Sequence, residues 1–288
     1  MNYRHNFHAG NFADVVKHAF LALIVRHFTQ KATPFRYIDT HAGLGVYDLY
    51  ADQARKTGEW REGVGRLWNA ELEPDIAELL APWRAAVDAV NSEGALRFYP
   101  GSPEVVRHLC RRDDRLILCE LHPQDARALE ERYARDRRVR AIAIDGWTGL
   151  NAYVPPKERR GIVLIDPPFE EPGELARMAT ALERAHQKWP TGTYVLWYPI
   201  KDPGETNAFL RRLREGAVPS ILNVELMIQS TENGTRLGGT GLVVVNPPWT
   251  LERNARRLLP ALARLLGRDG SATSRVQEIA PERSSTRA

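Results

Sequence analysis

The chain has 288 residues, of which 43% are hydrophobic, so its length allows one large domain or one domain that carries an insertion. The net charge of +4 and an isoelectric point near 9.1 mildly favour a polyanionic partner. The polar amino terminus predicts no signal peptide, and no apolar stretch has bilayer length, so we expect a soluble, cytoplasmic protein. Cys110 and Cys119 lack Cys-x-x-Cys spacing and are expected to be reduced core residues.

The first part of the chain predicts a tail, a helix and a strand. Residues 1–10 are polar and aromatic without a clear period and are expected to form an amino-terminal tail. Apolar residues at helical spacing predict a helix over residues 11–30, buried along one face, with Asn11 as its N-cap. A strand over residues 35–39 then runs into a small-residue turn at residues 40–45.

Residues 47–99 interrupt the alternation of strands and helices. Helical patterns occur near residues 63–69 and over residues 74–89, and no convincing strand is present. This segment therefore predicts an inserted helical subdomain, which divides the main domain into residues 1–46 and 100–282.

The alternation resumes after residue 100 and predicts a doubly wound α/β sheet. The last two predicted strands are joined by a Gly-rich loop and are expected to pair as a hairpin, and residues 283–288 are expected to be disordered. A seven-stranded, mostly parallel sheet with an antiparallel last strand is the Rossmann-like architecture of S-adenosylmethionine-dependent methyltransferases. The later strands are predicted over residues 115–120, 138–144, 161–165, 193–200, 221–228 and 240–246, and the later helices over residues 123–135, 170–189, 203–215 and 251–266.

The segment Asp166-Pro167-Pro168-Phe169 follows the apolar strand at residues 161–165. The prolines cannot donate ladder hydrogen bonds, so the chain must leave the sheet there as a stiff loop. Asp166 and the Pro167 carbonyl can each accept one hydrogen from an exocyclic amino group, and Phe169 can stack on a flat ring. The alternative is an ordinary strand exit in which Asp166 caps the next helix.

Acidic residues also end two other predicted strands. Glu120 is placed to accept hydrogen bonds from two ribose hydroxyls, or is a solvated strand-end charge. Asp145 can accept from an adenine amino group beside Gly146, or can cap a helix, and both roles are compatible. With Asp166 these residues are expected to form one wall on consecutive strands, which favours a methyltransferase. The turn at residues 40–45 has too few glycines for a dinucleotide enzyme.

Two further patterns compete with this interpretation. The segment Asn246-Pro247-Pro248-Trp249 resembles the Asp-Pro-Pro-Phe segment, but its strand is expected to be antiparallel and at the border of the sheet, with its end away from the site. Four histidines could form a metal site, but they lack a compact pair with a carboxylate or cysteine partner, so no metal is expected. These histidines are His5, His8, His18 and His41.

Several segments together resemble the RlmJ family of 23S ribosomal RNA adenine-N6 methyltransferases. The resemblance extends from about Asn2 to Glu282, and its amino-terminal block is the specific part, because Asp-Pro-Pro-aromatic occurs in many amino-methyltransferases. The matching segments are residues 3–18 (YRHNFHAGNFADVVKH), 39–43 (DTHAG), 99–103 (YPGSP), 118–123 (LCELHP) and 165–168 (IDPP).

The resemblance implies a methyltransferase domain with an inserted helical subdomain, S-adenosylmethionine as cofactor, and protein-free 23S rRNA as the partner of a monomeric enzyme. It places Asp166 at the catalytic position and Tyr3 near the RNA, where Arg4 and Lys17 are further candidates. One departure is Phe169, since the family usually has Tyr at this position; the change preserves stacking and removes a phenol hydroxyl. The cofactor contacts that the resemblance implies are His18, His41, Ser102, Glu120, Asp145 and Gly146.

The expected reaction is direct in-line methyl transfer to adenine N6. Acceptance of both amino hydrogens by Asp166 and the Pro167 carbonyl would free the nitrogen lone pair, and the remaining catalysis is positioning. Other functions stay open: methylation of a DNA adenine or a protein glutamine, or RNA binding by a non-catalytic module. Charge runs are usually solvated faces, and the basic clusters are Arg111-Arg112 and residues 135–140, 157–160 and 253–257. Residues 157–160 are the weakly preferred RNA contact, because that loop leads into the strand at residues 161–165, although it enters from the amino edge, opposite the site.

Overall fold

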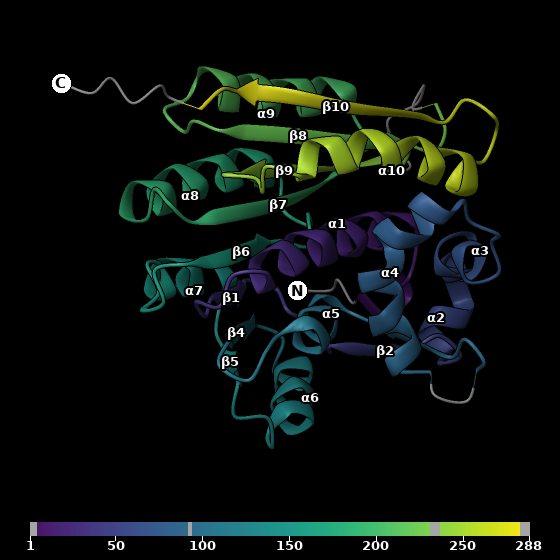
Figure 1. Cartoon of the computed structure of the whole chain (residues 1–288), viewed down its shortest axis with the longest axis horizontal. Coiled ribbons are helices and arrows are strands. Elements are labelled where there is room, and N and C mark those ends of the chain that lie inside the picture. The colour runs from purple at the N-terminus through teal and green to yellow at the C-terminus, as the bar shows by residue number, and fades with distance from the viewer. Residues whose placement is uncertain (1–4, 92–93, 231–236, 283–288) are drawn as a thin grey trace.

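The computed structural model describes residues 5–91, 94–230 and 237–282 (Figure 1). Tyr3, Arg4 and the tail at residues 283–288 lie outside these ranges. Within the described ranges the centre of the molecule is an eight-stranded sheet in the order β10-β8-β9-β7-β6-β1-β4-β5. Its strands are β1 (Arg36–Asp39), β4 (Arg115–Glu120), β5 (Val139–Ala143), β6 (Gly161–Ile165), β7 (Thr193–Ile200), β8 (Ile221–Met227), β9 (Gly239–Val245) and β10 (Thr273–Ala280).

Seven of these strands form the sheet that the sequence predicted. β5, β4, β1, β6 and β7 are parallel neighbours, and β9 is antiparallel to both β7 and β8. The predicted β8–β9 hairpin is therefore confirmed. The strand order is that of a doubly wound sheet, and β9, the last of the seven predicted strands, lies antiparallel between β7 and β8. The Rossmann-like fold class is therefore confirmed.

An eighth strand, β10, was not predicted. It pairs antiparallel with β8 at the sheet edge, in a segment for which no helix or strand was predicted. Ile279 is the one buried residue of β10. An edge strand that buries so little apolar surface carries no alternating hydrophobic pattern, which explains the wrong prediction.

Two helical layers cover the sheet. Tyr37 of β1 belongs to the core beneath the first layer, and its neighbour Ile38 belongs to the core beneath the second, because successive strand residues face opposite sides. The first layer contains α1 (Phe12–Thr29), α5 (Ser102–Leu109), α6 (Pro123–Tyr133) and α10 (Leu251–Leu266), and the second contains α7 (Gly146–Tyr153), α8 (Glu174–Lys188) and α9 (Pro203–Glu215).

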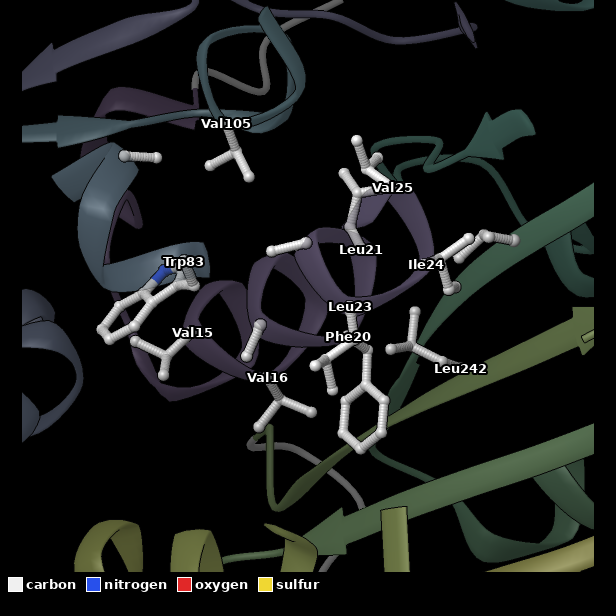
Figure 2. Packing of buried hydrophobic residues seen from close by; sticks show 14 of the residues in the cluster. Val15, Val16, Phe20, Leu21, Leu23, Ile24, Val25, Trp83, Val105 and Leu242 are labelled. Carbon is white, nitrogen blue, oxygen red and sulfur yellow. The ribbon is translucent and has the colours of Figure 1, made fainter. Parts of the chain in front are cut away.

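Helix α1 is buried on every side rather than along one face as predicted. All residues from Phe12 to Val25 are buried. Figure 2 shows Trp83 of α4 (Pro74–Ala89) against Val15, Val105 of α5 above the helix, and Leu242 of β9 on its sheet side. The face that would have met solvent is covered by α4, and this contact could not be foreseen from the local pattern.

The segment of residues 47–99 is mainly helical, as predicted. Against the prediction, two short strands pair antiparallel at its ends. They were not predicted because a three-residue strand is too short to show an alternating pattern and depends on its partner in the fold. Side chains of this segment, including Leu67 and Val87, belong to the same hydrophobic cluster as α1. The treatment of residues 47–99 as a separate subdomain remains a prediction. The elements here are β2 (Val46–Asp48), α2 (Asp52–Thr57), η2 (Glu59–Glu62), α3 (Val64–Trp68), α4 (Pro74–Ala89) and β3 (Phe98–Pro100), and η1 (His5–Phe7) precedes α1.

Two smaller expectations can be compared with the structure. Cys110 and Cys119 are buried and form no disulfide. Across the described ranges, no helix combines the length and apolar character needed to cross a bilayer.

Candidate active site

A cavity of about 710 Å³ opens at the carboxyl ends of β1, β4 and β6. It lies where the strand order reverses, with β4 on one side of β1 and β6 on the other, which is the usual ligand position in such sheets. The cavity wall includes eight of the predicted site residues: Lys17, His18, His41, Ser102, Glu120, Asp166, Pro167 and Phe169. Asp145 and Gly146 are not part of this wall.

Asp166 and Lys17 form an ion pair inside the cavity. The Lys17 ammonium lies 2.6 Å from Asp166 Oδ2 and 2.9 Å from Asp14 Oδ1. Lys17 is only 4% exposed, and although burial opposes its charge, the two carboxylates raise the pKa of Lys17 above its usual range. One cation is therefore shared by two acids. Asp166 Oδ1 has no hydrogen-bond partner within the described ranges, which leaves an acceptor at the cavity.

The loop after Asp166 holds Phe169 in an unusual backbone conformation. Phe169 has φ of 53°, in the left-handed region, and its N–H donates to Glu174 Oε2 at 2.7 Å. Glu174 is the first residue of α8, and burial raises the pKa of this carboxyl. The N-cap of α8 is Gly173, so the alternative in which Asp166 caps that helix is wrong.

An aromatic pair lines the same side of the cavity. The Phe169 ring meets Trp197 edge to face, with ring centroids 5.5 Å apart. Trp197 Nε1 donates to Thr240 Oγ1 at 2.7 Å, which fixes the indole on the sheet. The Lys17 ammonium lies 5.4 Å from the centre of the Trp197 ring. Trp197 was not predicted as a site residue, since nothing in the local sequence places a mid-strand tryptophan beside the Asp-Pro-Pro loop.

Glu120 faces the cavity from the end of β4. Its Oε2 accepts the Gly43 N–H and its Oε1 accepts the His122 N–H, each at 2.8 Å. The residue is 9% exposed, and burial raises its pKa, so it is not a solvated strand-end charge. Each carboxylate oxygen retains one acceptor position after these bonds, which suits a pair of ligand hydroxyls.

Ser102 is fixed by Asp39, an acid that the sequence analysis did not assign to the site. Ser102 Oγ and the Tyr37 hydroxyl each donate to Asp39 Oδ2 at 2.7 Å. Asp39 is fully buried, and burial raises its pKa to about 6. Its position at the end of β1 could have identified it, because the three assigned acids also follow strand ends.

The three acidic residues follow strands that are consecutive in the chain, β4, β5 and β6, but these strands are not all neighbours in the sheet. β1 separates β6, which leads to Asp166, from β4, which ends at Glu120. The reversal of strand order at β1 is the reason, because order along the chain differs from order in the sheet.

His18 and His41 are neutral side chains in the wall. His18 Nδ1 lies 2.9 Å from the Tyr99 hydroxyl, and burial lowers the pKa of His18 to about 3. His41 Nδ1 lies 2.8 Å from Thr40 Oγ1, and burial lowers the pKa of His41 to about 4. Neutral imidazoles can donate or accept one hydrogen bond without introducing charge. No group of three His, Cys, Asp or Glu side chains in the described part of the chain is arranged to hold a metal ion.

Asp145 and Gly146 have structural roles next to the cavity. Asp145 is the N-cap of α7 and accepts the Thr148 N–H at 2.8 Å. A Cβ on Gly146 would lie 2.2 Å from the Thr40 carbonyl oxygen, so only glycine allows this close packing. The capping role of Asp145 is thus confirmed, and its predicted contact with an adenine remains a prediction.

Asn246 does not belong to the site. β9 lies between β7 and β8 and not at the border of the sheet, because β8 and β10 extend the sheet beyond it. The Asn246 side chain donates to the carbonyls of Pro190 and Gly192 at 2.8 Å, beside the start of β7. Its segment therefore lies at the edge opposite Asp166, as the antiparallel direction predicted.

Comparison with known proteins identifies the family. The family model described as "RsmJ: Ribosomal RNA large subunit methyltransferase D, RlmJ" matches residues 32–277. Two proteins named Ribosomal RNA large subunit methyltransferase J, from Haemophilus influenzae and Escherichia coli, are each 38% identical over 98% of this chain and 100% of their own length. The crystal structure of protein LPL1258 from Legionella pneumophila matches with a TM-score of 0.85 at 33% identity, over 94% of this chain and 98% of that one. The chain therefore belongs to the RlmJ family of ribosomal RNA large subunit methyltransferases.

Proposed function

We propose that this chain transfers the methyl group of S-adenosylmethionine to N6 of a specific adenine in 23S rRNA. The observation that carries the proposal is the Asp166 carboxylate in the cavity, with one oxygen held by Lys17 and the other available to an incoming amino group. Family membership and the relatives' names support ribosomal RNA of the large subunit as the substrate.

The donors and acceptors of the cavity wall fit S-adenosylmethionine, which supplies a sulfonium-bound methyl group when it is bound. Glu120 would accept hydrogen bonds from the ribose hydroxyls with its remaining lone pairs. The other residues proposed to hold the cofactor are His18, His41 and Ser102 in the wall, with Asp145 and Gly146 next to His41 at its rim.

Asp166 and its neighbours would prepare the substrate nitrogen. The amino lone pair of adenine is delocalised into the ring, so the nitrogen is a poor nucleophile. Asp166 Oδ1 and the Pro167 carbonyl would each accept one amino hydrogen, which turns the nitrogen toward tetrahedral geometry and directs its lone pair at the methyl group. The Phe169 ring would stack on the base after it leaves its helix or loop.

Replacement of the catalytic carboxylate tests this proposal. Asp166→Ala should lower methyl incorporation into in vitro transcribed 23S rRNA by about 10²–10⁴-fold. The dissociation constant for S-adenosylmethionine, measured by calorimetry, should change only a few-fold. The exposed Asp269 provides a matched control, and Asp269→Ala should keep wild-type turnover. Substantial turnover by Asp166→Ala would refute the role of this carboxylate.

The alternative substrates give distinct products in the same experiment. Mass spectrometry of digested rRNA should find N6-methyladenosine at one position with the wild-type enzyme. Methyl transfer to duplex DNA or to a protein glutamine, without transfer to rRNA, would favour another amino-methyltransferase. Cofactor binding without turnover on any substrate would favour a non-catalytic RNA-binding module.

We also propose that the enzyme acts as a cytoplasmic monomer on rRNA that is free of ribosomal proteins. Light scattering should give the mass of one 32.6 kDa chain. Assembled large subunits should be much poorer substrates than the naked RNA.

A further inference from the structure

The fold brings two separate basic segments onto one surface. Arg112 precedes β4, and Arg137 precedes β5, and these strands are parallel neighbours in which Leu116 pairs with Val139. Their amino-terminal ends therefore meet at the same edge of the sheet. Helix α6 ends beside them and adds Arg132 and, just beyond its last turn, Arg135. We refer to Arg112, Arg132, Arg135 and Arg137 as the arginine face.

The arginine face borders two adjoining hollows. Their volumes are about 870 and 620 Å³, and they share Asp136 and Arg137 in their linings. All four arginines are exposed, and none makes an ion pair with any residue in the described ranges.

Three of the four acids that line the two hollows are paired with other arginines, and the fourth, Asp113, makes no ion pair within the described ranges. Arg107 lies 2.6 Å from Glu104, and Arg138 lies 2.6 Å from Asp136. Asp113 therefore offsets only part of the positive charge of the four arginines, and the arginine face keeps a net positive charge. Guanidinium groups match phosphate oxygens with two parallel N–H donors, so uncompensated arginines in a hollow suit a phosphate backbone.

The other basic clusters are partly used within the protein. Arg160 donates to the carbonyls of Thr33 and Phe28, at 2.6 and 3.3 Å. Arg256 pairs with Glu252 and Arg257 pairs with Asp75, which leaves less net charge on that side of the molecule. The arginine face is thus the better candidate for a surface that binds a polyanion.

Helix α6 connects the arginine face to the active site. Asp125 in its first turn lines the catalytic cavity, and Arg132 in its last turn lines the larger hollow. The two residues are separated by about 10 Å along the helix axis. A nucleic acid strand advances roughly 3.4 Å of helix axis per phosphate. A strand that follows α6, at the lower end of the molecule in Figure 1, would reach the arginine face about three nucleotides beyond the cavity wall at Asp125.

We propose that the arginine face binds the phosphate backbone of the RNA arm that flanks the target adenine. The identity of the RNA in this inference rests on the proposed function. The location of the binding surface is argued from the four arginines and α6 alone. Phosphate contacts fix the register of the RNA on the enzyme, while the cavity selects the base.

Removal of three of these charges tests the inference. The variant Arg132→Gln/Arg135→Gln/Arg137→Gln should bind in vitro transcribed 23S rRNA with a salt dependence whose logarithmic slope is smaller by about two to three than that of the wild type. The KM for rRNA should rise by about tenfold or more at 0.15 M salt. The turnover number at saturating RNA and the affinity for S-adenosylmethionine should be unchanged.

A matched variant controls for net charge. Arg211→Gln/Arg214→Gln/Arg253→Gln removes three exposed arginines from α9 and α10, which make no ion pair in the part of the chain that the structure describes. It should retain the wild-type KM and salt slope. If both triple variants behave alike, the arginine face has no special role and the inference is overturned.

The remaining outcomes separate the inference from the proposed function. Methylation by the wild type, with an unchanged salt slope in the arginine-face variant, would overturn the inference and leave the proposed function standing. A reduced salt slope, combined with no rRNA methylation by the wild type, would support the RNA-binding surface and refute the proposed function. Loss of affinity for polyglutamate alone would assign the surface to an acidic protein and overturn the inference.

Discussion

At the scale of single residues, Lys17 decides how the catalytic carboxylate is held. Its ammonium contacts Asp14 and Asp166 at hydrogen-bonding distance inside a buried site. Lys17→Met would leave two carboxylates facing the cavity without their shared cation, and we expect the turnover number to fall by about tenfold or more. The KM for rRNA should change little. A rise in KM without a loss of turnover would instead support the direct RNA contact that the sequence suggested, and Lys17→Arg, which keeps the charge, should recover part of the activity.

Glu174 is the residue that holds the backbone of the Asp-Pro-Pro-Phe loop. It accepts the N–H of Phe169, whose positive φ needs such support. Glu174→Ala would leave that N–H without its acceptor, at a cost of about 1–3 kcal/mol. We expect about tenfold slower methylation with an unchanged affinity for S-adenosylmethionine. Glu174→Gln keeps an acceptor oxygen and should retain most activity; equal losses in both variants would contradict a positioning role.

At the scale of elements, α4 completes the burial of α1. Trp83 is 1% exposed and packs in the same cluster as Val15 (Figure 2). Trp83→Ala should lower the free energy of unfolding by about 3–5 kcal/mol, which urea denaturation followed by circular dichroism would measure. The exposed Glu78 on the same helix is the control, and Glu78→Ala should stay within about 0.5 kcal/mol. A loss below about 1 kcal/mol for Trp83→Ala would mean that α4 is only loosely attached.

Elements with a strong local pattern could be predicted from the sequence, and those without one could not. Helices α4, α9 and α10 begin and end at the residues that their periodicity indicated. β2, β3 and β10 are short or polar and depend on pairing with a distant partner, so no local pattern marks them. The same distinction applies to the residues of the site. Asp166 was predictable because two prolines end its strand, whereas its ion pair with Lys17, 149 residues away in sequence, exists only through the packing of α1.

At the scale of the whole molecule, two neutral histidines of the cavity wall, the buried His18 and the half-buried His41, lower the stability of the fold in acid. The pKa of His18 is lowered to about 3 and that of His41 to about 4, from an ordinary value near 6.5, in both cases by burial. As pH falls below 6.5 the unfolded chain takes up protons that the folded chain does not, so stability declines with acid until the folded-state pKa is reached. Each histidine should lower the free energy of unfolding by about 1.5 kcal/mol between pH 6.5 and 5.

Denaturation at a series of pH values would measure this decline. His18→Gln should flatten the curve between pH 6.5 and 5. His108→Gln, at an exposed position of α5, should leave the curve as in the wild type. Identical curves for all three proteins would contradict the assignment of this loss of stability in acid to His18.

The burial of α1 on every side also has a consequence for folding during synthesis on the ribosome. α1 leaves the ribosome long before α10, which packs against it. At a synthesis rate of about 5–20 residues per second, an apolar helix must wait on the order of ten seconds or more for its final neighbour. During that interval the apolar side chains of α1 are exposed and can aggregate with other nascent chains. A chaperone that binds apolar segments during synthesis should therefore increase the yield of active enzyme.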